Sequence, residues 1–481
     1  MKKLLFVLAI LTFLAAPGRI FAQEVNKFGI HILEPNEIRQ AAELVNLPGG
    51  DWGWVTIALR VNDFNQKKWQ NFFDDCRRLH IIPLVRLATE NENESWRKPT
   101  TGDIDQFVVF LSSLNWPTKD QHIIVFNEPN HAKEWGGETN PAEYAHILDY
   151  AIDKFKKANK NFIILNAGFD LAADNSAGTM DVYRYWQIMN RAVPGVFDRL
   201  DAWSSHSYPN PDFAGKPTDQ GRKSITGYRW EINILGSAFG LKKNLPVFIT
   251  ETGWPHQDNS KPKNQNPKPS NFLNQETITE YTKAAFEVWL ADPKVQAVTP
   301  FVLNYHAAPL DAFSWLDQEG KDYPHCRAIR EMRKPTWWPE QAESWEIEAL
   351  DLPKFLPINS HYQGKITLKN TGQSIWGEKN FAFVSLSDFA DNLVLPPGAK
   401  VEPGESYQFI FNITASKWPE TASLKWEGLE EEATISFFNP SKLDSYQDNF
   451  WQKILALIKV WWYQKFPQEK INYQENTSTH D

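Results

Sequence analysis

Short apolar runs rich in β-branched residues recur along the first two thirds of the chain, and a helix-like pattern follows most of them. The eight runs cover residues 27–32, 54–60, 81–87, 122–127, 162–168, 202–208, 246–251 and 297–305. Helical periodicity between them includes residues 36–45, 67–79, 142–158, 277–290 and 324–332. Eight such alternations predict an α/β fold, a (β/α)8 TIM barrel over residues 23–338. An open doubly wound sheet is the alternative, but no Gly-rich phosphate loop follows the first run.

The connections that lead from a strand to a helix differ in length from those that lead from a helix to a strand. Those from helix to strand are short, whereas the strand-to-helix connections are long, at residues 88–101, 129–140, 209–220, 252–271 and 306–321. In a barrel the long connections share the C-terminal rim, where the active sites of this fold lie. They carry Trp96, Trp135, Trp254 and Trp315. Because a flat indole can bind the C–H face of a sugar, we expect Trp135, Trp254 and Trp315 to contact a carbohydrate.

Two of the predicted strands end in a glutamate. The fourth runs into Asn127-Glu128-Pro129, and the seventh ends at Glu251. Side chains at the C-terminal ends of barrel strands point into the rim cleft, and strands four and seven lie across the barrel from each other. Glycoside hydrolysis needs two such carboxyl groups, one near the leaving oxygen and one near the anomeric carbon. The alternative, two unrelated surface acids, is disfavoured by the pairing.

The Asn127-Glu128-Pro129 motif, with Glu251 three strands later, resembles the clan A glycoside hydrolases, which are retaining (β/α)8 enzymes. The resemblance covers residues 27–335. It implies that Glu128 is the acid/base and that Glu251 is the nucleophile that forms a glycosyl-enzyme ester. It also implies that Asn127 binds the sugar 2-hydroxyl. The acid must keep its proton at a pH where the nucleophile is ionised.

Further strand-end residues extend this resemblance. His206 and Tyr208 are two apart on one strand face and are similar to the clan's strand-six His and Tyr, with Tyr208 near the nucleophile. The clan has an Arg that supports the nucleophile, and both Arg60 and Arg86 lie at strand ends; the sequence does not decide between them. His31 on the first strand is a candidate sugar ligand, with a structural core histidine as the alternative.

The end of the eighth run departs from the clan. Where those enzymes often have a Trp as a floor under the reactive sugar, this chain reads Leu303-Asn304-Tyr305-His306. We expect Tyr305 to stack on the sugar instead, or Trp315 to reach back from the following loop.

The hydrophobic period changes after residue 338. Residues 339–440 show short alternating runs separated by turn residues, such as residues 364–368, 381–384 and 407–411. This pattern predicts a small all-β sandwich domain. Residues 369–372 with residues 401–405 resemble the immunoglobulin-like accessory modules of exported enzymes, which bind glycan or act as spacers; we favour a spacer or packing partner.

Both ends of the chain carry apolar segments of another kind. Residues 1–22 combine a basic start, a short apolar run and a small residue at Ala22, which predicts a signal peptide and an exported protein. A retained membrane anchor is the alternative. Residues 441–481 are predicted to form an amphipathic C-terminal helix and a disordered tail. Residues 450–463 could make peripheral contact with a membrane interface or pack on the protein.

The composition and charge of the chain restrict the kinds of molecule that it is expected to bind. The chain has 481 residues, with 50 Lys+Arg against 59 Asp+Glu and a formal net charge of −9. Without a basic block it is a poor binder of nucleic acid. The 11 His show no paired ligand spacing, so we expect no metal and no cofactor. The sequence defines no oligomeric state.

These observations favour an exported retaining glycoside hydrolase that cleaves a β-linked oligo- or polysaccharide. Two alternatives stay open. One is a carbohydrate-binding or cell-surface protein on a barrel that no longer catalyses, which the intact pair of Glu disfavours. The other is a transglycosylase that uses the same residues.

Overall fold

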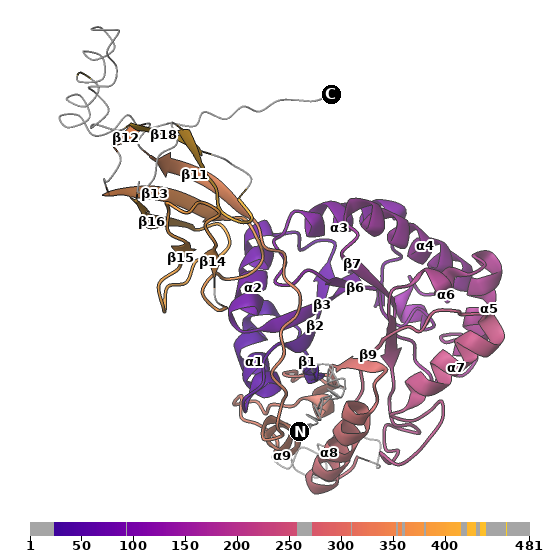
Figure 1. Cartoon of the computed structure of the whole chain (residues 1–481). Helices are drawn as coiled ribbons and strands as arrows, with labels where there is room; N and C mark the ends of the chain where they lie inside the picture. Colours follow the sequence, from indigo (N-terminus) through magenta and orange to yellow (C-terminus); the bar gives the residue numbers. More distant parts are fainter. Residues whose placement is uncertain are drawn as a thin grey trace, which may run out of the picture.

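A computed structural model describes residues 24–92, 94–256, 272–308, 310–352, 355–357, 361–379, 381–414, 421–429, 433–438 and 458. Its larger part is a ring of parallel strands surrounded by helices (Figure 1). The barrel strands are β1 (Gly29–His31), β2 (Gly53–Arg60), β3 (Ile81–Ala88), β6 (Gln121–Val125), β7 (Phe162–Asn166), β8 (Trp203–His206), β9 (Val247–Glu251) and β10 (Val295–Val298). A short hairpin of β4 (Asn91–Glu92) and β5 (Ser95–Trp96) follows β3.

The barrel closes through two sheets. Strands pair in the orders β1-β2-β3-β6-β7 and β10-β9-β8. Single parallel bridges join the two sheets, Phe28 to Val298 and Leu165 to Ala202. These strands are rich in Val, Ile and Leu and are buried on both faces, as expected of parallel strands covered by helices.

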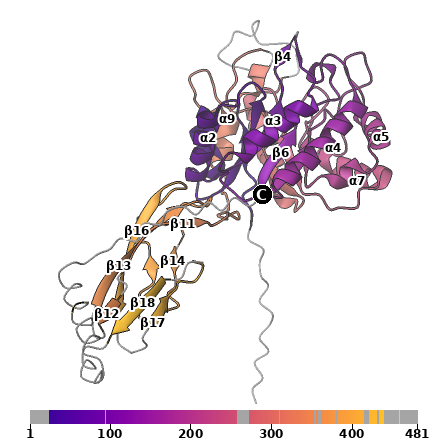
Figure 2. The same cartoon turned by 90° about the horizontal axis from the view of Figure 1, so that it is seen from above.

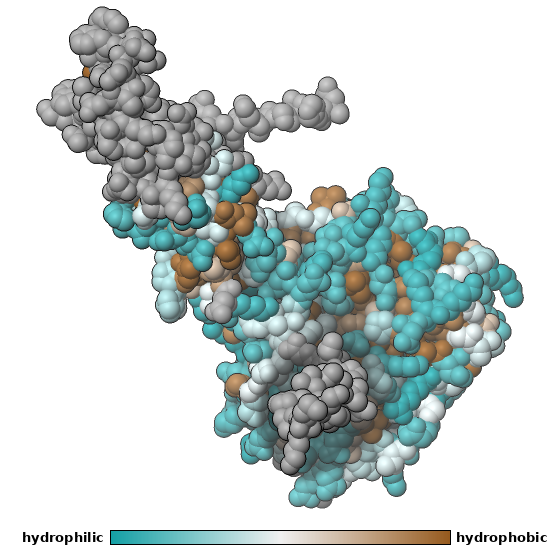
Figure 3. All heavy atoms as spheres, in the orientation of Figure 1, coloured by the Kyte–Doolittle hydropathy of each residue, from teal (hydrophilic) through white to brown (hydrophobic). Residues whose placement is uncertain are grey.

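The barrel helices lie outside the strands and turn their apolar faces inward. They are α1 (Ile38–Asn46), α2 (Gln66–Arg78), α3 (Thr101–Ser112), α4 (Pro141–Ala158), α5 (Val182–Ala192), α6 (Val196–Arg199), α7 (Gly227–Phe239), α8 (Gln275–Ala291) and α9 (Pro324–Arg330), with 3-10 turns η1 (Pro35–Glu37), η2 (Ala132–Glu134) and η3 (Leu310–Phe313). Their ends follow local chemistry: Asn140, for example, caps α4 by accepting from the Glu143 N–H, and Pro141 occupies the first turn. Polar residues cover much of the barrel's outer surface (Figure 3).

The second part is all β. It contains β11 (Trp345–Asp351), β12 (Phe355–Pro357), β13 (His361–Asn370), β14 (Ala382–Phe383), β15 (Leu393–Val394), β16 (Ser406–Thr414), β17 (Thr421–Leu424) and β18 (Ala433–Phe438). They form sheets in the orders β11-β13-β16 and β12-β18-β17, with a β14–β15 hairpin. Side chains alternate along β13 and β16 and enclose a separate core around Leu368, Trp376 and Phe411.

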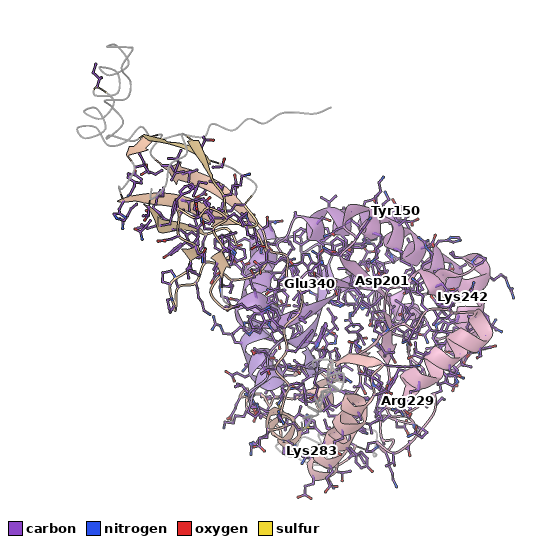
Figure 4. The ribbon with its side chains drawn as sticks, in the orientation of Figure 1. Tyr150, Asp201, Arg229, Lys242, Lys283 and Glu340 are labelled. Carbon is purple, nitrogen blue, oxygen red and sulfur yellow. The ribbon has the colours of Figure 1, made fainter. Side chains whose placement is uncertain are left out.

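The all-β domain attaches to the N-terminal end of the barrel, opposite the β4–β5 hairpin (Figure 2). The connecting segment crosses that end: the Trp337 indole donates to the Trp52 carbonyl at 2.9 Å, and the Lys119 N–H donates to the Glu340 carbonyl at 2.9 Å. Figure 4 labels Glu340 at this junction. Arg78 of α2 then forms a bidentate ion pair with Glu402. The two domains are thus joined by specific polar contacts as well as by the chain.

The predicted (β/α)8 barrel with a following β domain is confirmed. The eighth strand differs, because β10 ends at Val298 and residues 299–305 form a loop that runs over the rim. The predicted signal peptide lies outside the described residues, as does the C-terminal helix apart from Ile458. Among the described residues, no helix is long and apolar enough to cross a membrane.

Candidate active site

A cleft of about 580 Å³ opens at the C-terminal ends of the barrel strands. Several of the predicted site residues line it: Arg60, Arg86, Asn127, Glu128, Tyr208, Glu251 and Tyr305. They come from six different strands or the loops that follow them. The fold therefore brings together residues as far apart in the sequence as Arg60 and Tyr305.

Glu251 ends β9 and is buried at the floor of this cleft. One carboxylate oxygen accepts from the Arg86 guanidinium at 2.6 Å, and the other accepts from the Tyr208 hydroxyl at 3.2 Å. Burial alone would raise the pKa of Glu251, but the charges of His206 and Arg86 and the hydrogen bond from Arg86 lower it to about 2. This carboxyl group is therefore ionised at neutral pH.

Glu128 follows β6 and faces Glu251 across the cleft. One of its oxygens lies 2.8 Å from His206 Nδ1, and the same nitrogen lies 3.8 Å from a Glu251 oxygen. Burial lowers the pKa of His206, but the neighbouring charges of Glu251 and Glu128 outweigh it and raise the pKa. Oxygens of the two carboxyl groups lie within 4.8 Å of each other. That limit lies below the ~6.5–9.5 Å that separates the two carboxyl groups of inverting glycosidases.

The backbone around Glu128 is unusual. Phe126 and Glu128, on either side of Asn127, have φ angles of 71° and 28°. Such conformations are unfavourable for residues with a β-carbon and persist only where the surroundings impose them. The Glu128 N–H donates to the Gly168 carbonyl at 3.0 Å, and a β-carbon on Gly168 would lie 2.0 Å from the His206 ring. Gly168 thus provides the space that lets His206 reach Glu128.

Of the two candidate arginines, Arg86 supports Glu251. Its Nη1 donates to Glu251 and also to the Asn127 side-chain oxygen at 2.8 Å. This contact decides between the two arginines that the sequence left open, because Arg60 is exposed at the rim, where its guanidinium lies 5.9 Å from the centre of the Trp96 ring. In the β2–β3 register Arg86 pairs with Ala58, so Arg60 lies two residues further along its strand, beyond the level of Arg86.

The three tryptophans predicted to bind sugar do not line the cleft. Trp135 is fully buried, and its indole donates to Glu143 at 2.9 Å; Trp254 is buried and donates to the Gly215 carbonyl at 2.8 Å. Trp315 is buried against His325. Each fills the space beneath a long loop. Burial of a large aromatic ring stabilises the loop that covers it.

Two predicted histidine roles also change. His31 is fully buried behind Glu251, with its Nδ1 3.7 Å from a Glu251 oxygen, and it does not line the cleft. Burial lowers the pKa of His31 to about 3, so its ring is neutral. His206 is likewise buried, and it contacts the two glutamates rather than the open space of the cleft.

The aromatic lining of the cleft comes from other residues. Phe301 borders the cleft at the end of the eighth strand region and packs edge-on against His31 at 5.2 Å. Tyr208, Phe213 and Phe313 form an edge-to-face cluster beside it, and Trp96 lines the other side. Sequence reasoning missed Phe301 because the predicted eighth strand extended too far and placed the rim at Tyr305.

Sequence reasoning also missed a third carboxyl group. Glu134, at the end of η2, lines the cleft, where burial and the negative charge of Glu128 raise its pKa to about 7. Beside it, His131 pairs with Asp170 at 2.8 Å, and both line the same wall. The only available signal was their place in the long loops after strands four and five.

Glu128, His206 and Glu251 are close enough to be ligands of one metal ion. In this arrangement Arg86 already supplies a positive charge to Glu251, and His206 is hydrogen-bonded to Glu128. All three groups therefore have protein partners, and the expectation of a metal-free site stays a prediction.

Comparisons with known proteins agree with this site. Residues 87–285, which include both glutamates, match the family model for Cellulase (glycosyl hydrolase family 5). No curated protein matches the chain.

Solved structures with a similar fold include three glycosidases. One is a glycoside hydrolase family 128 endo-β-1,3-glucanase from Pseudomonas viridiflava, with 12% identity over 64% of this chain and 99% of that chain and a TM-score of 0.40. Another is a monomeric β-xylosidase from Caulobacter crescentus, with 12% identity over 82% of this chain and 97% of that chain and a TM-score of 0.44. The third is a glucosidase from Croceicoccus marinus, with 10% identity over 82% of this chain and 96% of that chain and a TM-score of 0.46.

The barrel and the family match define the class of this protein: it is a glycosidase. The domain that carries the site is similar to family 5 cellulases, and the resemblance to clan A read from the sequence is confirmed. The immunoglobulin-like character of the β domain stays a prediction.

Proposed function

We propose that this protein is an exported retaining glycoside hydrolase that cleaves a β-linked glycan by double displacement. The observation that carries the proposal is the pair of carboxyl groups, whose oxygens lie within 4.8 Å of each other across the cleft. A gap this short leaves room for direct attack by one carboxylate but not for an intervening water.

In the first step, Glu251 attacks the anomeric carbon and forms an ester as the glycosidic C–O bond breaks. Glu128 donates its proton to the departing oxygen, so the leaving group departs as an alcohol. The low pKa of Glu251 supports the assignment of nucleophile, because a nucleophile must be ionised at working pH.

In the second step, water attacks the same carbon and Glu128 removes its proton. The ester bond breaks, Glu251 regains its negative charge, and the released sugar keeps its original anomeric configuration. His206 contacts both carboxyl groups. With its raised pKa it supplies positive charge between them, so it offsets the repulsion that would otherwise oppose a second negative charge in the cleft.

Substrate binding is assigned to the cleft lining. Asn127, held by Arg86, presents its amide beside the catalytic pair and is placed to bind a sugar 2-hydroxyl. Phe301, Tyr305 and Trp96 offer aromatic surface for sugar rings. The open cleft suits an oligo- or polysaccharide, and export would bring the enzyme to glycans outside the cell.

The test is sugar release from a panel of β-linked polysaccharides and oligosaccharides by the wild type and by Glu251→Ala. We expect release from at least one substrate and its loss in the variant. Glu319→Ala, which removes an exposed carboxylate away from the cleft, serves as a matched control and should keep full activity. Tight binding of one glycan without release by the wild type would favour a carbohydrate-binding protein, and longer products would favour a transglycosylase.

A further inference from the structure

A histidine and an aspartate form a hydrogen-bonded pair in the wall of the cleft, and the two-carboxylate chemistry does not use them. His131 Nε2 lies 2.8 Å from Asp170 Oδ2. His131 comes from the loop after β6 and Asp170 from the loop after β7, and both side chains line the cavity. Their exposed fractions are 31% and 28%. The pair is therefore within reach of a molecule that enters the cleft.

The two loops that carry this pair are already joined by another side chain. Asn130 is buried, and its amide nitrogen donates to the Asp170 carbonyl at 3.0 Å and to the Met180 carbonyl at 3.2 Å. The Asn130 side-chain oxygen accepts from the Asp170 N–H at 3.2 Å. A partly exposed ion pair adds little to stability beside such contacts. The His131–Asp170 pair is thus not needed to hold the loops, and its place in the cleft calls for a chemical reason.

Asp170 fixes how the histidine ring is presented. Asp170 Oδ1 accepts from the Ala172 N–H at 2.7 Å, which leaves Oδ2 for His131. Burial raises the pKa of Asp170, but the hydrogen bonds from His131 and Ala172 outweigh it and lower the pKa, so the carboxylate is ionised. A carboxylate only accepts, so His131 Nε2 donates to it and Nδ1 is the nitrogen left for a further partner. Nδ1 accepts a hydrogen bond in the neutral ring and donates one in the charged ring. A hydroxyl group can do both, so it matches either form.

The position of the pair relative to Glu128 points to the leaving-group side of the cleft. In the proposed mechanism Glu128 gives its proton to the departing oxygen. The His131 N–H donates to the Glu128 carbonyl at 2.8 Å, so the histidine is fixed to the residue that protonates the leaving group. Asp170 extends this wall onto the loop after β7, whereas Arg60 and Trp96 border the cleft from the other direction, at β2 and β5. A sugar beyond the departing oxygen is then bounded by the loops after β6 and β7.

We propose that His131 binds a hydroxyl group of the leaving-group sugar and that Asp170 is the positioning residue that orients the ring for this contact. The ligand class is a neutral glycosyl unit, because its hydroxyl groups can pair with Nδ1 in either form of the ring. An aryl leaving group offers no such hydroxyl. The contact therefore speeds cleavage of an oligo- or polysaccharide and leaves the cleavage of aryl glycosides unchanged. This inference rests on the proposed function, because it needs a leaving group that Glu128 protonates.

Two substrates with the same reacting sugar test this assignment. One is the β-linked oligosaccharide that the wild type cleaves fastest, and the other is the aryl β-glycoside of the same sugar. The parameter is kcat/KM, which reports the step in which the leaving group departs. His131→Phe keeps a ring but loses both nitrogens, and it should lower kcat/KM about 10- to 100-fold on the oligosaccharide and less than about 3-fold on the aryl glycoside. Asp170→Asn keeps an acceptor for the Ala172 N–H but loses the charge, and it should show the same split with a smaller loss.

A second measurement runs the same step in reverse. The enzyme is first trapped with an activated 2-deoxy-2-fluoro β-glycoside, and the sugar that the wild type releases as its leaving group is then added. By microscopic reversibility this sugar occupies the leaving-group side: its hydroxyl attacks the anomeric carbon, Glu128 takes the proton, and the ester to Glu251 breaks. The added sugar should therefore speed the recovery of activity in the wild type. In His131→Phe this acceleration should be about 10-fold smaller, whereas recovery in water alone should be unchanged.

His146→Phe is the matched control, since it replaces an exposed histidine of α4 that does not line the cleft. It should leave kcat/KM unchanged on both substrates. The activity of each variant on the aryl glycoside also shows that its cleft is correctly folded. Equal losses on both substrates in His131→Phe, full activity on the oligosaccharide, or an undiminished response to the added sugar would overturn the proposal. A wild type that cleaves neither substrate would instead overturn the proposed function.

Discussion

The two ends of the barrel differ in how their charged side chains are arranged. At the N-terminal end, His80 stacks on Trp52 and contacts Trp338, and it bridges Asp51 of the barrel and Glu378 of the β domain. Charges there meet opposite charges, and aromatic rings meet each other. At the C-terminal end, Glu128, Glu134 and Glu251 gather around one space. The first end is arranged for stability, whereas the second concentrates like charges.

The carboxyl groups gathered at the C-terminal end lower the stability of the folded protein. Like charges brought together in a half-buried cleft repel each other, and such clusters occur mainly at functional sites. The β domain lies at the far end of the barrel from the cleft (Figure 2). Substitutions at the cleft should therefore change activity first, and substitutions at the N-terminal end should change stability first.

The largest expected effect comes from Arg86. Arg86→Met should lower kcat/KM by about 10²- to 10³-fold, because Glu251 and Asn127 both lose a charged donor. Arg86 lowers the pKa of Glu251, so its removal raises that pKa. Activity needs ionised Glu251, and the variant should therefore lose activity at a higher pH than the wild type as the pH falls. The measurement is a pH profile of kcat/KM.

Arg60→Met is the matched control for that substitution, since it removes the other rim guanidinium without touching Glu251. It should leave the acidic limb of the pH profile in place. An equal shift in both variants would mean that the charge of the cleft as a whole, rather than the Arg86 contact, sets the ionisation of Glu251.

At the opposite end, Trp338→Ala should lower the free energy of unfolding by about 2–4 kcal/mol, because it removes a ring packed against Trp52 and His80. Activity well below the melting temperature should not change. Thermal unfolding followed by circular dichroism, with kcat measured on the same preparation, separates the two quantities. A loss of activity without a loss of stability would break the comparison between the two ends.

Glu134→Gln should stabilise the protein at alkaline pH. The pKa of Glu134 is raised from 4.5 to about 7, so its folded-state proton stabilises the protein below pH 4.5 and this contribution is lost as the pH rises through 7. The variant has no such loss, and at pH 8 it should exceed the wild type by roughly 1–2 kcal/mol. Urea unfolding at pH 5 and pH 8 gives the difference; equal values at both pH would contradict the charge arrangement described for the cleft.

The smallest effect is expected at His80. Burial lowers its pKa, but hydrogen bonds to Glu378 and Asp51 outweigh this and raise it above 6.5. Its contribution is therefore full below pH 6.5 and is lost as the pH rises through the folded-state pKa. Compared with His80→Gln, the wild type should gain about 1 kcal/mol at pH 6 and much less at pH 9. A constant difference in melting temperature across that range would exclude a charged bridge between the domains.

The barrel and the meeting of Glu128 and Glu251 in one cleft were predictable because both depend on strand order. Glu128 and Glu251 each end an apolar run, and the fold fixes where the ends of parallel strands meet. The positions of His206 and Tyr208 could be predicted from the two-residue alternation of side chains along a strand. The choice between Arg60 and Arg86 needed the actual distance to Glu251, which differs for neighbouring strands although both arginines occupy strand ends.

The three tryptophans that failed as predictions lie in loops. Trp135, Trp254 and Trp315 have the chemistry of sugar platforms, but the sequence does not tell which face of a loop is covered. Phe301 and Glu134 reach the cleft because of how two loops bend, and no periodic pattern records that bend. Most roles at strand ends could be predicted, with His31 and Arg60 as exceptions, whereas roles that depend on loop shape required the structure.

The central claim is that Glu251 forms a covalent bond with the sugar. The direct measurement is incubation with an activated 2-deoxy-2-fluoro β-glycoside of the sugar that the wild type releases, followed by intact mass and peptide mapping. The account predicts a mass increase of one fluoroglycosyl unit, located on Glu251 and absent from Glu251→Ala. Sugar release with inverted anomeric configuration, or an adduct on Glu128 or Glu134 instead, would contradict it.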